Sequence, residues 1–323
     1  MGLAVSYAIA DKTFLERTKP RVEQMLTDIR NEFDQMVLET DWMDAYTKYE
    51  SLEKSKAMKS LIGFPEWILD DEKLEEHYQG ISPTHHVENW VTALEFMNTE
   101  WLRSWRVKNS KVWDMDPTVV NAYNIFERNA INIPVAIIQY PFYYLGLDAL
   151  NYGAPRGSSR HELTHGFDNA GRHYDKYGNE KRWWSNHTPA GVRQARPVSR
   201  GAVQFVLLSG SEGIYQWYAD ARGEHCDNGG LREAFRAYKA YVKRNGPEPV
   251  LPGFEDFTQR TVAVHLQYCE TVSPAVAKYL VKDEHSPSKF RVLGVLSNMP
   301  EFGEAYQCPS GSKMNPKRKC RVW

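Results

Sequence analysis

The pentapeptide His161-Glu162-Leu163-Thr164-His165 is the feature that most constrains this chain. Its histidines are four residues apart, so on an α-helix both imidazoles project from one face and can chelate one zinc ion. Glu162 is not needed as a ligand and can instead take a proton from a water molecule whose pKa a zinc ion lowers to about 7. The pattern indicates a zinc site on a helix, and the competing interpretation is a surface helix that carries two histidines.

The overall composition is that of a globular protein large enough for one or two domains. The chain has 323 residues, 42% of them apolar and 25% charged, with 40 basic against 41 acidic side chains. This balance gives no sign of disorder or of a nucleic-acid-binding surface. No run reaches the roughly 18 apolar residues of a membrane helix, so we expect no membrane segment and no secretion signal in this chain.

Two weak features point to an oxidising compartment. Asn186-His187-Thr188 is a glycosylation sequon. The cysteines are either disulfide partners or reduced core residues, and the sequence leaves both readings open; they are Cys226, Cys269, Cys308 and Cys320.

The hydrophobic periodicity predicts a mainly α fold with a small β-sheet. Apolar residues at three-and-four spacing favour helices over 13–40, 43–62, 85–106, 158–168 and 231–244. A stretch ending in Thr118 to Tyr123 is typical of an edge strand, and Ile131 to Ile133 is its expected partner.

What surrounds the zinc motif resembles the neprilysin family of zinc metalloendopeptidases over nearly the whole chain. The segment from His161 to Trp184, HELTHGFDNAGRHYDKYGNEKRWW, matches the family almost residue by residue. Further matches follow in the family's order: Asn121-Ala122-Tyr123, Asp148 to Gly153, Asp227 to Leu231, His285-Ser286-Pro287, Phe290-Arg291-Val292 and Cys320 to Trp323. The resemblance implies a thermolysin-like zincin domain, incomplete at its N-terminus, over 61–323. Residues 1–60 would be a helical segment from the tail of the family's cap domain and its linker.

The resemblance also implies a role for each matching side chain. His161 and His165 would bind one Zn²⁺ per chain, with an acidic residue just before Asp227 as third ligand, for which Glu224 is the candidate. Glu162 would be the general base, and Asp227 would orient a ligand histidine through its other ring nitrogen. Substrate contacts would come from His285 at the developing oxyanion, Asn121 and Ala122 on the substrate backbone, and Arg291 on a substrate carbonyl.

The resemblance fails between Thr188 and Asp227. Read one nucleotide later, codons for Gln216 to Cys226 can encode Asn-Gly-Thr-x-Thr-Leu-Gly-Glu-Asn-Ile-Ala, which the family has before Asp227, and Pro189 to Gln204 gives a second such match. We hypothesise that residues 189–226 are translated out of frame. In the chain as it stands, Glu224 lies three residues before Asp227 instead of the family's four, a rotation of about 100° on a helix.

The function implied is hydrolysis of short peptides on the amino side of bulky hydrophobic residues, with a water molecule activated by zinc and Glu162. The alternative is a catalytically impaired neprilysin-like fragment that binds peptides or a partner without cleaving them. Intact family members are anchored at the extracellular face of the plasma membrane or secreted. Cys269 and Cys308 match cysteines that pair outside this stretch of the family, so we expect both to be unpaired.

Overall fold

The structure is a computed structural model that describes residues 2–9, 11–105, 115–143, 146–153, 159–188, 222–250 and 287–319, with isolated positions at 107, 113, 268, 271–273 and 275–276. Within these ranges the chain is mostly helical with one three-stranded sheet, as the sequence predicts. The division at residue 60 stays a prediction.

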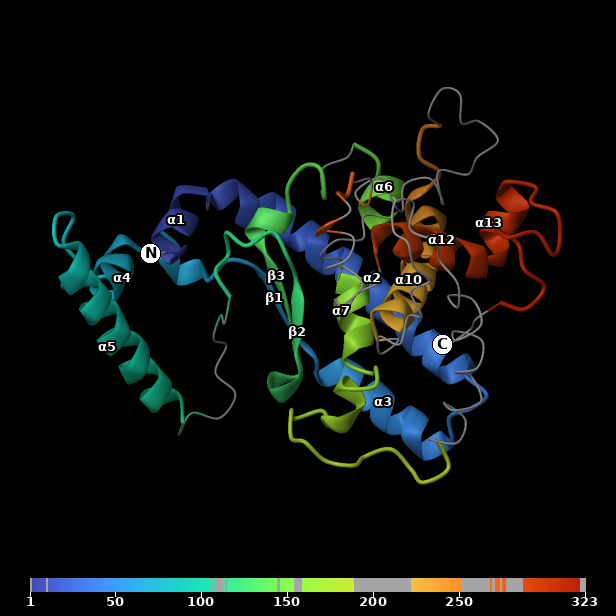
Figure 1. The fold of residues 1–323 in the computed structure, drawn as a ribbon, viewed down its shortest axis with the longest axis horizontal. Helices are drawn as coiled ribbons and strands as arrows, with labels where there is room; N and C mark the ends of the chain where they lie inside the picture. Colours follow the sequence, from blue (N-terminus) through green and yellow to red (C-terminus); the bar gives the residue numbers. More distant parts are fainter. Residues whose placement is uncertain are drawn as a thin grey trace.

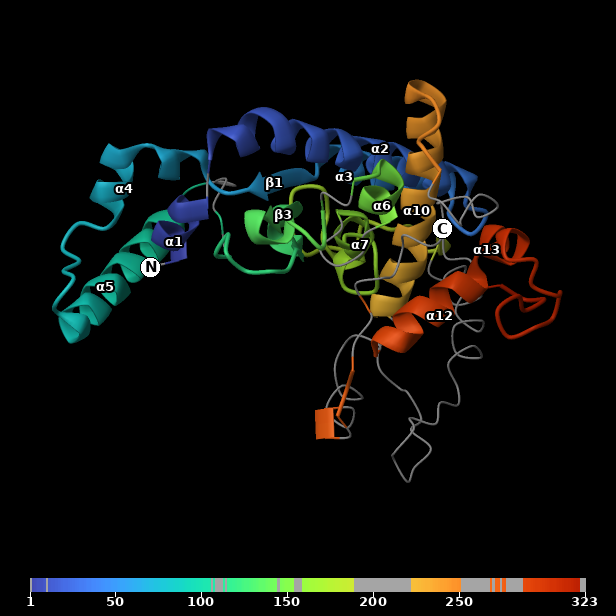
Figure 2. The ribbon, with the colours of Figure 1, turned by 90° about the horizontal axis from the view of Figure 1, so that it is seen from above.

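The N-terminal helices include one long element, α2. After α1 (Gly2–Ile9) and a π-helical turn (Phe14–Thr18), helix α2 (Lys19–Glu39) runs along one side of the fold (Figure 2). The predicted helix over 13–40 is therefore confirmed. Helix α3 (Ala45–Ala57) follows, then a 3-10 turn (Glu66–Leu69), α4 (Asp71–His77) and α5 (His86–Ser104), with α4 and α5 at one end of the molecule (Figure 1).

The predicted helix over 43–62 is wrong in its last residues. Strand β1 (Lys59–Gly63) follows α3 and pairs in parallel with β3 (Ala130–Pro134). A short apolar run such as Leu61-Ile62 suits either a helix or a strand, and the pairing with β3 decides between them.

The predicted edge strand is displaced along the chain. Strand β2 is Tyr123–Ile125, and it pairs antiparallel with β3 in the sheet order β1-β3-β2. The segment before it turns instead, because Asp116 Oδ1 accepts from the Thr118 amide at 3.0 Å and the Asp116 carbonyl from the Val119 amide at 3.0 Å. The predicted partner strand around Ile131 is confirmed.

Helix α7 (Ser159–His165), which carries the predicted zinc motif and is called the zinc helix below, lies between the sheet and two long helices. It packs against β2 and β3 on one side and against α2 and α10 (Arg222–Asn245) on the other (Figure 1). Leu163 of α7 is fully buried in the main core, and Phe167 just after the helix packs on Phe33 of α2 with ring centroids 4.6 Å apart and planes tilted by 40°.

Helix α10 begins earlier than predicted, at Arg222 instead of residue 231. Consecutive glycines at 229 and 230 disfavour a helix by propensity alone. A Cβ on Gly230 would lie 3.1 Å from Arg160 Cγ and 3.3 Å from the His161 amide nitrogen. The glycine therefore lets α10 approach the zinc helix closely, and this packing maintains the helix through the glycine pair.

The remaining described elements complete the surroundings of α7 and α10. They are 3-10 turns at Phe126–Arg128, Val135–Ile137 and Gly171–His173, and helices α6 (Asp148–Gly153), α12 (Ser288–Asn298) and α13 (Pro300–Ala305). Among the described helices, none combines the length and apolar character needed to cross a membrane.

We expect Phe33→Ala to destabilise the fold by about 3–5 kcal/mol, because it removes a fully buried ring that packs behind the zinc helix. Urea unfolding followed by circular dichroism measures the change. Leu38→Ala is the matched control on α2, since Leu38 is 48% exposed and its truncation should cost little. Equal losses in the two variants would contradict this placement of Phe33.

Candidate zinc site

The two histidines of α7 point their Nε2 atoms at each other. The His161 and His165 Nε2 atoms are 3.0 Å apart, and the ring planes are nearly perpendicular, at 88°. Two imidazoles bound through Nε2 to one tetrahedral zinc at about 2.0–2.1 Å would have these atoms roughly 3.3 Å apart. The pair therefore fits a zinc ion with little rearrangement.

A carboxylate stands at the other nitrogen of each ring. His161 Nδ1 lies 2.8 Å from Asp227 Oδ1, and His165 Nδ1 lies 2.7 Å from Asp168 Oδ2. A ring that donates through Nδ1 keeps its Nε2 lone pair for a metal. Two such lone pairs at 3.0 Å repel each other unless a proton or a cation lies between them, so this position holds either a shared proton or a metal ion.

Asp227, in helix α10, is held by Arg291 as well as by His161. Arg291 of α12 binds it through two bonds, Nε to Oδ2 at 2.6 Å and Nη2 to Oδ1 at 2.7 Å. Burial alone would raise the pKa of Asp227, but the charges of Arg291 and His161 hold this pKa far below its ordinary value. Asp227 is therefore ionised and can fix the orientation of His161, as the resemblance implies.

Asp168, which the sequence reading did not single out, does the same for His165. Its Oδ1 accepts from the amides of Ala170 at 2.7 Å and Gly171 at 2.8 Å, while Oδ2 faces the ring. Burial would raise the pKa of Asp168, yet the bond to His165 and the two amides lower it. Its spacing could have identified it, because Asp168 lies only three residues after His165 and is therefore close enough to contact that ring.

The pKa values of the histidines are shifted in opposite directions. Burial lowers the pKa of His161 despite the opposing charge of Asp227. Burial also acts to lower the pKa of His165, but the bond to Asp168 and the charge of Glu162 outweigh it and raise the pKa. Of the two imidazoles, His161 is thus the readier to be neutral and metal-binding near neutral pH.

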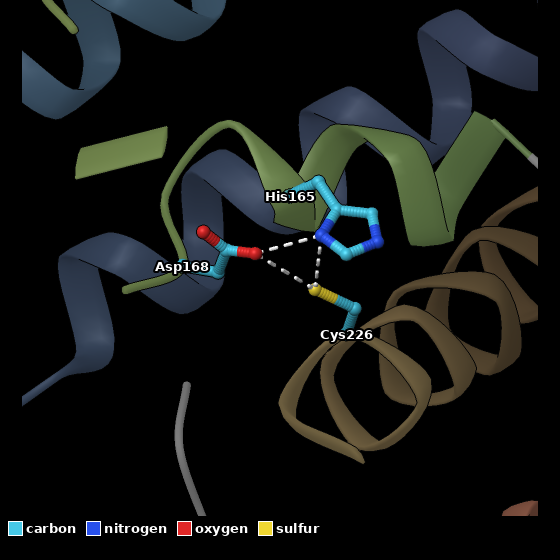
Figure 3. Close-up of side chains that lie close together, drawn as sticks. All are labelled: His165, Asp168 and Cys226. Atoms are coloured by element: carbon cyan, nitrogen blue, oxygen red, sulfur yellow. Dashed lines mark hydrogen bonds and ion pairs between the residues drawn. The ribbon is translucent and has the colours of Figure 1, made fainter. Parts of the chain in front are cut away.

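Cys226 lies next to Asp168 at the edge of the His165 ring (Figure 3). Its fully buried Sγ is 3.2 Å from His165 Nδ1 and 3.9 Å from Asp168 Oδ2, and the three side chains form a group that could hold a metal. The sulfur is on the Nδ1 edge, whereas an ion shared with His161 would sit at Nε2. Burial raises the pKa of this thiol well above its ordinary value. Cys226 and Asp168 therefore both contact the His165 ring at Nδ1. The candidate zinc site uses Nε2 on the other side of the same ring.

The other predicted site residues are distributed as follows. Glu162 is 6% exposed, and its carbonyl accepts from Asn124 Nδ2 of the edge strand at 2.7 Å. Asn121 is exposed and Ala122 is buried, directly before β2. Glu224 belongs to the first turn of α10, but its side chain lies outside the described part, as do all of His285 and Cys269. Cys308 is a free cysteine, as expected. The assigned roles of these side chains stay predictions.

Arg291 is in the site but is bound differently from the expectation. The sequence reading assigned it to a substrate carbonyl, whereas its Nε and Nη2 both bind Asp227 and its guanidinium lies 4.9 Å from the Tyr268 ring centroid. In the described structure Arg291 thus acts on His161 through Asp227.

Comparisons with known proteins place the chain in a family. Two family models, both described as peptidase family M13, match residues 1–65 and 121–322. The chain belongs to peptidase family M13. Endothelin-converting enzyme 1 of Mus musculus is 35% identical over 341 residues, and neprilysin-1 of Caenorhabditis elegans is 36% identical over 338. Both alignments cover all of this chain, which spans 43% and 45% of those two relatives.

The fold of this M13 chain is also that of a solved M13-type structure. The open state of the Mycobacterium tuberculosis zinc metalloprotease Zmp1 matches with a TM-score of 0.84 at 26% identity, over 100% of this chain and 51% of the other. The zincin-like fold that the sequence implied is confirmed.

A buried acid lies behind the zinc helix of this M13 chain. Glu233 of α10 is fully buried, with Oε1 2.8 Å from Thr164 Oγ1, and that same hydroxyl is 2.9 Å from the Arg160 carbonyl. One hydroxyl proton serves one acceptor, so both contacts are hydrogen bonds only when Glu233 is protonated and donates. Burial raises the pKa of Glu233 to about 8, in agreement with this arrangement.

We predict that Asp168→Asn weakens zinc binding by about 10- to 100-fold, because removal of a carboxylate behind a ligand histidine typically has that effect. Competition with a chromophoric chelator measures the zinc dissociation constant. Glu180→Gln removes an exposed carboxylate just after the same loop, and it should change the constant less than threefold. Equal effects would argue against the role of Asp168.

Glu233→Gln should make stability less dependent on pH. The folded pKa of about 8 lies above the ordinary 4.5, so the folded chain keeps a proton that the unfolded chain loses. The parent should therefore lose stability as the pH rises from about 5 to 8, and the amide variant should lack this part of the loss. Urea unfolding at several pH values tests this, with exposed Glu304→Gln expected to follow the parent.

Proposed function

We propose that this chain is the catalytic part of a zinc-dependent metalloendopeptidase. The observation that carries the proposal is the 3.0 Å approach of the two Nε2 atoms, each ring being fixed at Nδ1 by an ionised carboxylate. Membership of peptidase family M13 supports the same activity.

His161, His165 and a third residue would hold one zinc ion per chain. When bound, zinc supplies a Lewis acid that polarises a carbonyl and lowers the pKa of water. Glu224 is the third ligand we propose, because it is the acidic side chain in the first turn of α10, one helical turn before Asp227.

The chain's own residues would divide the remaining work. Glu162 takes the proton from the attacking water and later passes it to the leaving amine. Asp227 and Asp168 keep the ligand histidines in the correct tautomer. Asn121 and Ala122, before the edge strand, would hold the substrate backbone, with His285 on the developing oxyanion.

Short peptides cleaved on the amino side of bulky hydrophobic residues are the substrates we propose. One relative is named endothelin-converting enzyme 1, which supports a peptide as substrate. Extracellular action, at the membrane surface or after secretion of the intact protein, is part of this proposal.

One observation favours an impaired protein that binds peptides without cleaving them. Gly223 occupies the buried position four residues before Asp227, where the resemblance places the third ligand. Glycine has no side chain to bind zinc, so metal binding depends on Glu224 reaching the ion from the next position.

The decisive experiment is Glu162→Gln, tested with a fluorogenic peptide that carries a central Phe or Leu. We expect the parent to bind one zinc per chain and to cleave, and the variant to keep its zinc while losing at least 100-fold in kcat/KM. Metal analysis and initial rates give both readouts.

Glu224→Ala tests the third ligand, and the behaviour of the parent distinguishes the zinc peptidase from the impaired peptide-binding protein. A large loss of zinc in this variant would support Glu224 as third ligand. A parent that binds peptide without zinc or cleavage would support the impaired alternative, and a parent that cleaves without zinc would contradict the proposal.

A further inference from the structure

A lysine is buried beside the zinc helix. Lys54 of α3 is only 2% exposed, although lysine is almost never fully buried without partners. The residue is more than 100 positions away in sequence from the groups that its side chain contacts. Such a placement requires compensation, and the contacts show where it comes from.

The Lys54 ammonium is surrounded by three main-chain carbonyl oxygens. Its Nζ lies 2.6 Å from Gly166 O, 2.8 Å from Gly171 O and 2.6 Å from Tyr174 O. The three N–H donors of an ammonium match three acceptors, whereas a neutral amine has only two. The rings of Phe167 and Trp183 complete the cage at 5.3 Å and 5.5 Å from Nζ.

Two carboxylates balance the charge in this cage. Burial lowers the pKa of Lys54 to about 7, while the charges of Asp168 and Asp175 act in the opposite direction. Both aspartates belong to the loop that supplies the carbonyls. This loop, residues 166–174 with Asp175, thus folds around the ammonium.

The same loop places Asp168 behind His165. Asp168 Oδ1 accepts from the amides of Ala170 and Gly171, and its Oδ2 meets His165 Nδ1 at 2.7 Å. The loop turns back so tightly that a Cβ on Gly171 would lie 2.0 Å from the His165 carbonyl oxygen. The Gly171 carbonyl and its amide thus connect Lys54 directly to Asp168.

We propose that Lys54 is a positioning residue for the zinc site, which fixes the 166–174 loop through its three carbonyls and thereby holds Asp168 against His165. Without the ammonium, three buried carbonyls lose their donor and the loop relaxes. Asp168 then orients His165 less well. The consequence for zinc rests on the proposed function, while the consequence for the His165–Asp168 bond does not.

The test compares Lys54→Met with Lys56→Met, which removes an exposed lysine from the same helix. In the metal-free protein labelled with ¹⁵N-histidine, the His165 Nδ1 proton bound to Asp168 should give a slowly exchanging downfield signal. We expect Lys54→Met to lose or broaden this signal and Lys56→Met to keep it. Zinc affinity should fall about tenfold in Lys54→Met and stay unchanged in Lys56→Met.

A double-mutant cycle separates positioning from general stabilisation. If Lys54 acts through Asp168, then Lys54→Met should weaken zinc binding far less in an Asp168→Asn background than in the parent. If Lys54→Met does not fold, Lys54→Gln replaces it, since its amide keeps two donors for the carbonyls.

The proposal is overturned if the folded Lys54 variant keeps the His165 signal, or if its loss of zinc affinity is the same in both backgrounds. A parent that binds no zinc would refute the proposed function alone, because the histidine signal still decides the role of Lys54.

Discussion

Each imidazole of the zinc helix is fixed by a carboxylate at Nδ1, and the surrounding structure serves to keep those two contacts in place. The contacts direct two Nε2 lone pairs at each other across 3.0 Å. In the chain without a metal, a proton on one Nε2 atom turns this contact into a hydrogen bond, in keeping with the raised pKa of His165. The folded chain is therefore pre-formed for a metal, and metal binding should stabilise the fold in turn.

The two carboxylates are themselves buried charges, and the fold compensates them in different ways. Asp227 receives a full positive charge from Arg291, whereas Asp168 receives two backbone amides and the nearby charge of Lys54. A buried charge without such partners would cost several kcal/mol. The two histidines also differ, because burial lowers the pKa of His161, whereas the bond to Asp168 helps to raise the pKa of His165.

The sequence predicted the zinc helix, the helical class and the partner strand, because each rests on a local pattern. It could not predict what depends on contacts between distant segments. The strand at Lys59–Gly63 forms through pairing with β3, and α10 continues through Gly230 because the zinc helix packs against it. Asp168 could have been predicted from its spacing, three residues after His165. Lys54 could not be predicted, since nothing in its helix marks one lysine as buried. Arg291 was assigned to a substrate carbonyl from the resemblance, and its contact with Asp227, 64 residues away, could not be predicted either.

The two halves of the site also differ in how much of the chain each of them needs. In the His165 half, the contacts of Lys54 with the 166–174 loop and of Asp168 with His165 all lie within the first 174 residues, and only Trp183 and Cys226 add to them from later in the chain. The His161 half requires Asp227 and then Arg291, near the end of the chain. Since a chain emerges from the ribosome N-terminus first, one imidazole can acquire its orientation before the other has its partner. We therefore expect the orientation of His161 to be fixed later than that of His165, once α10 has packed on α7 and α12 on α10.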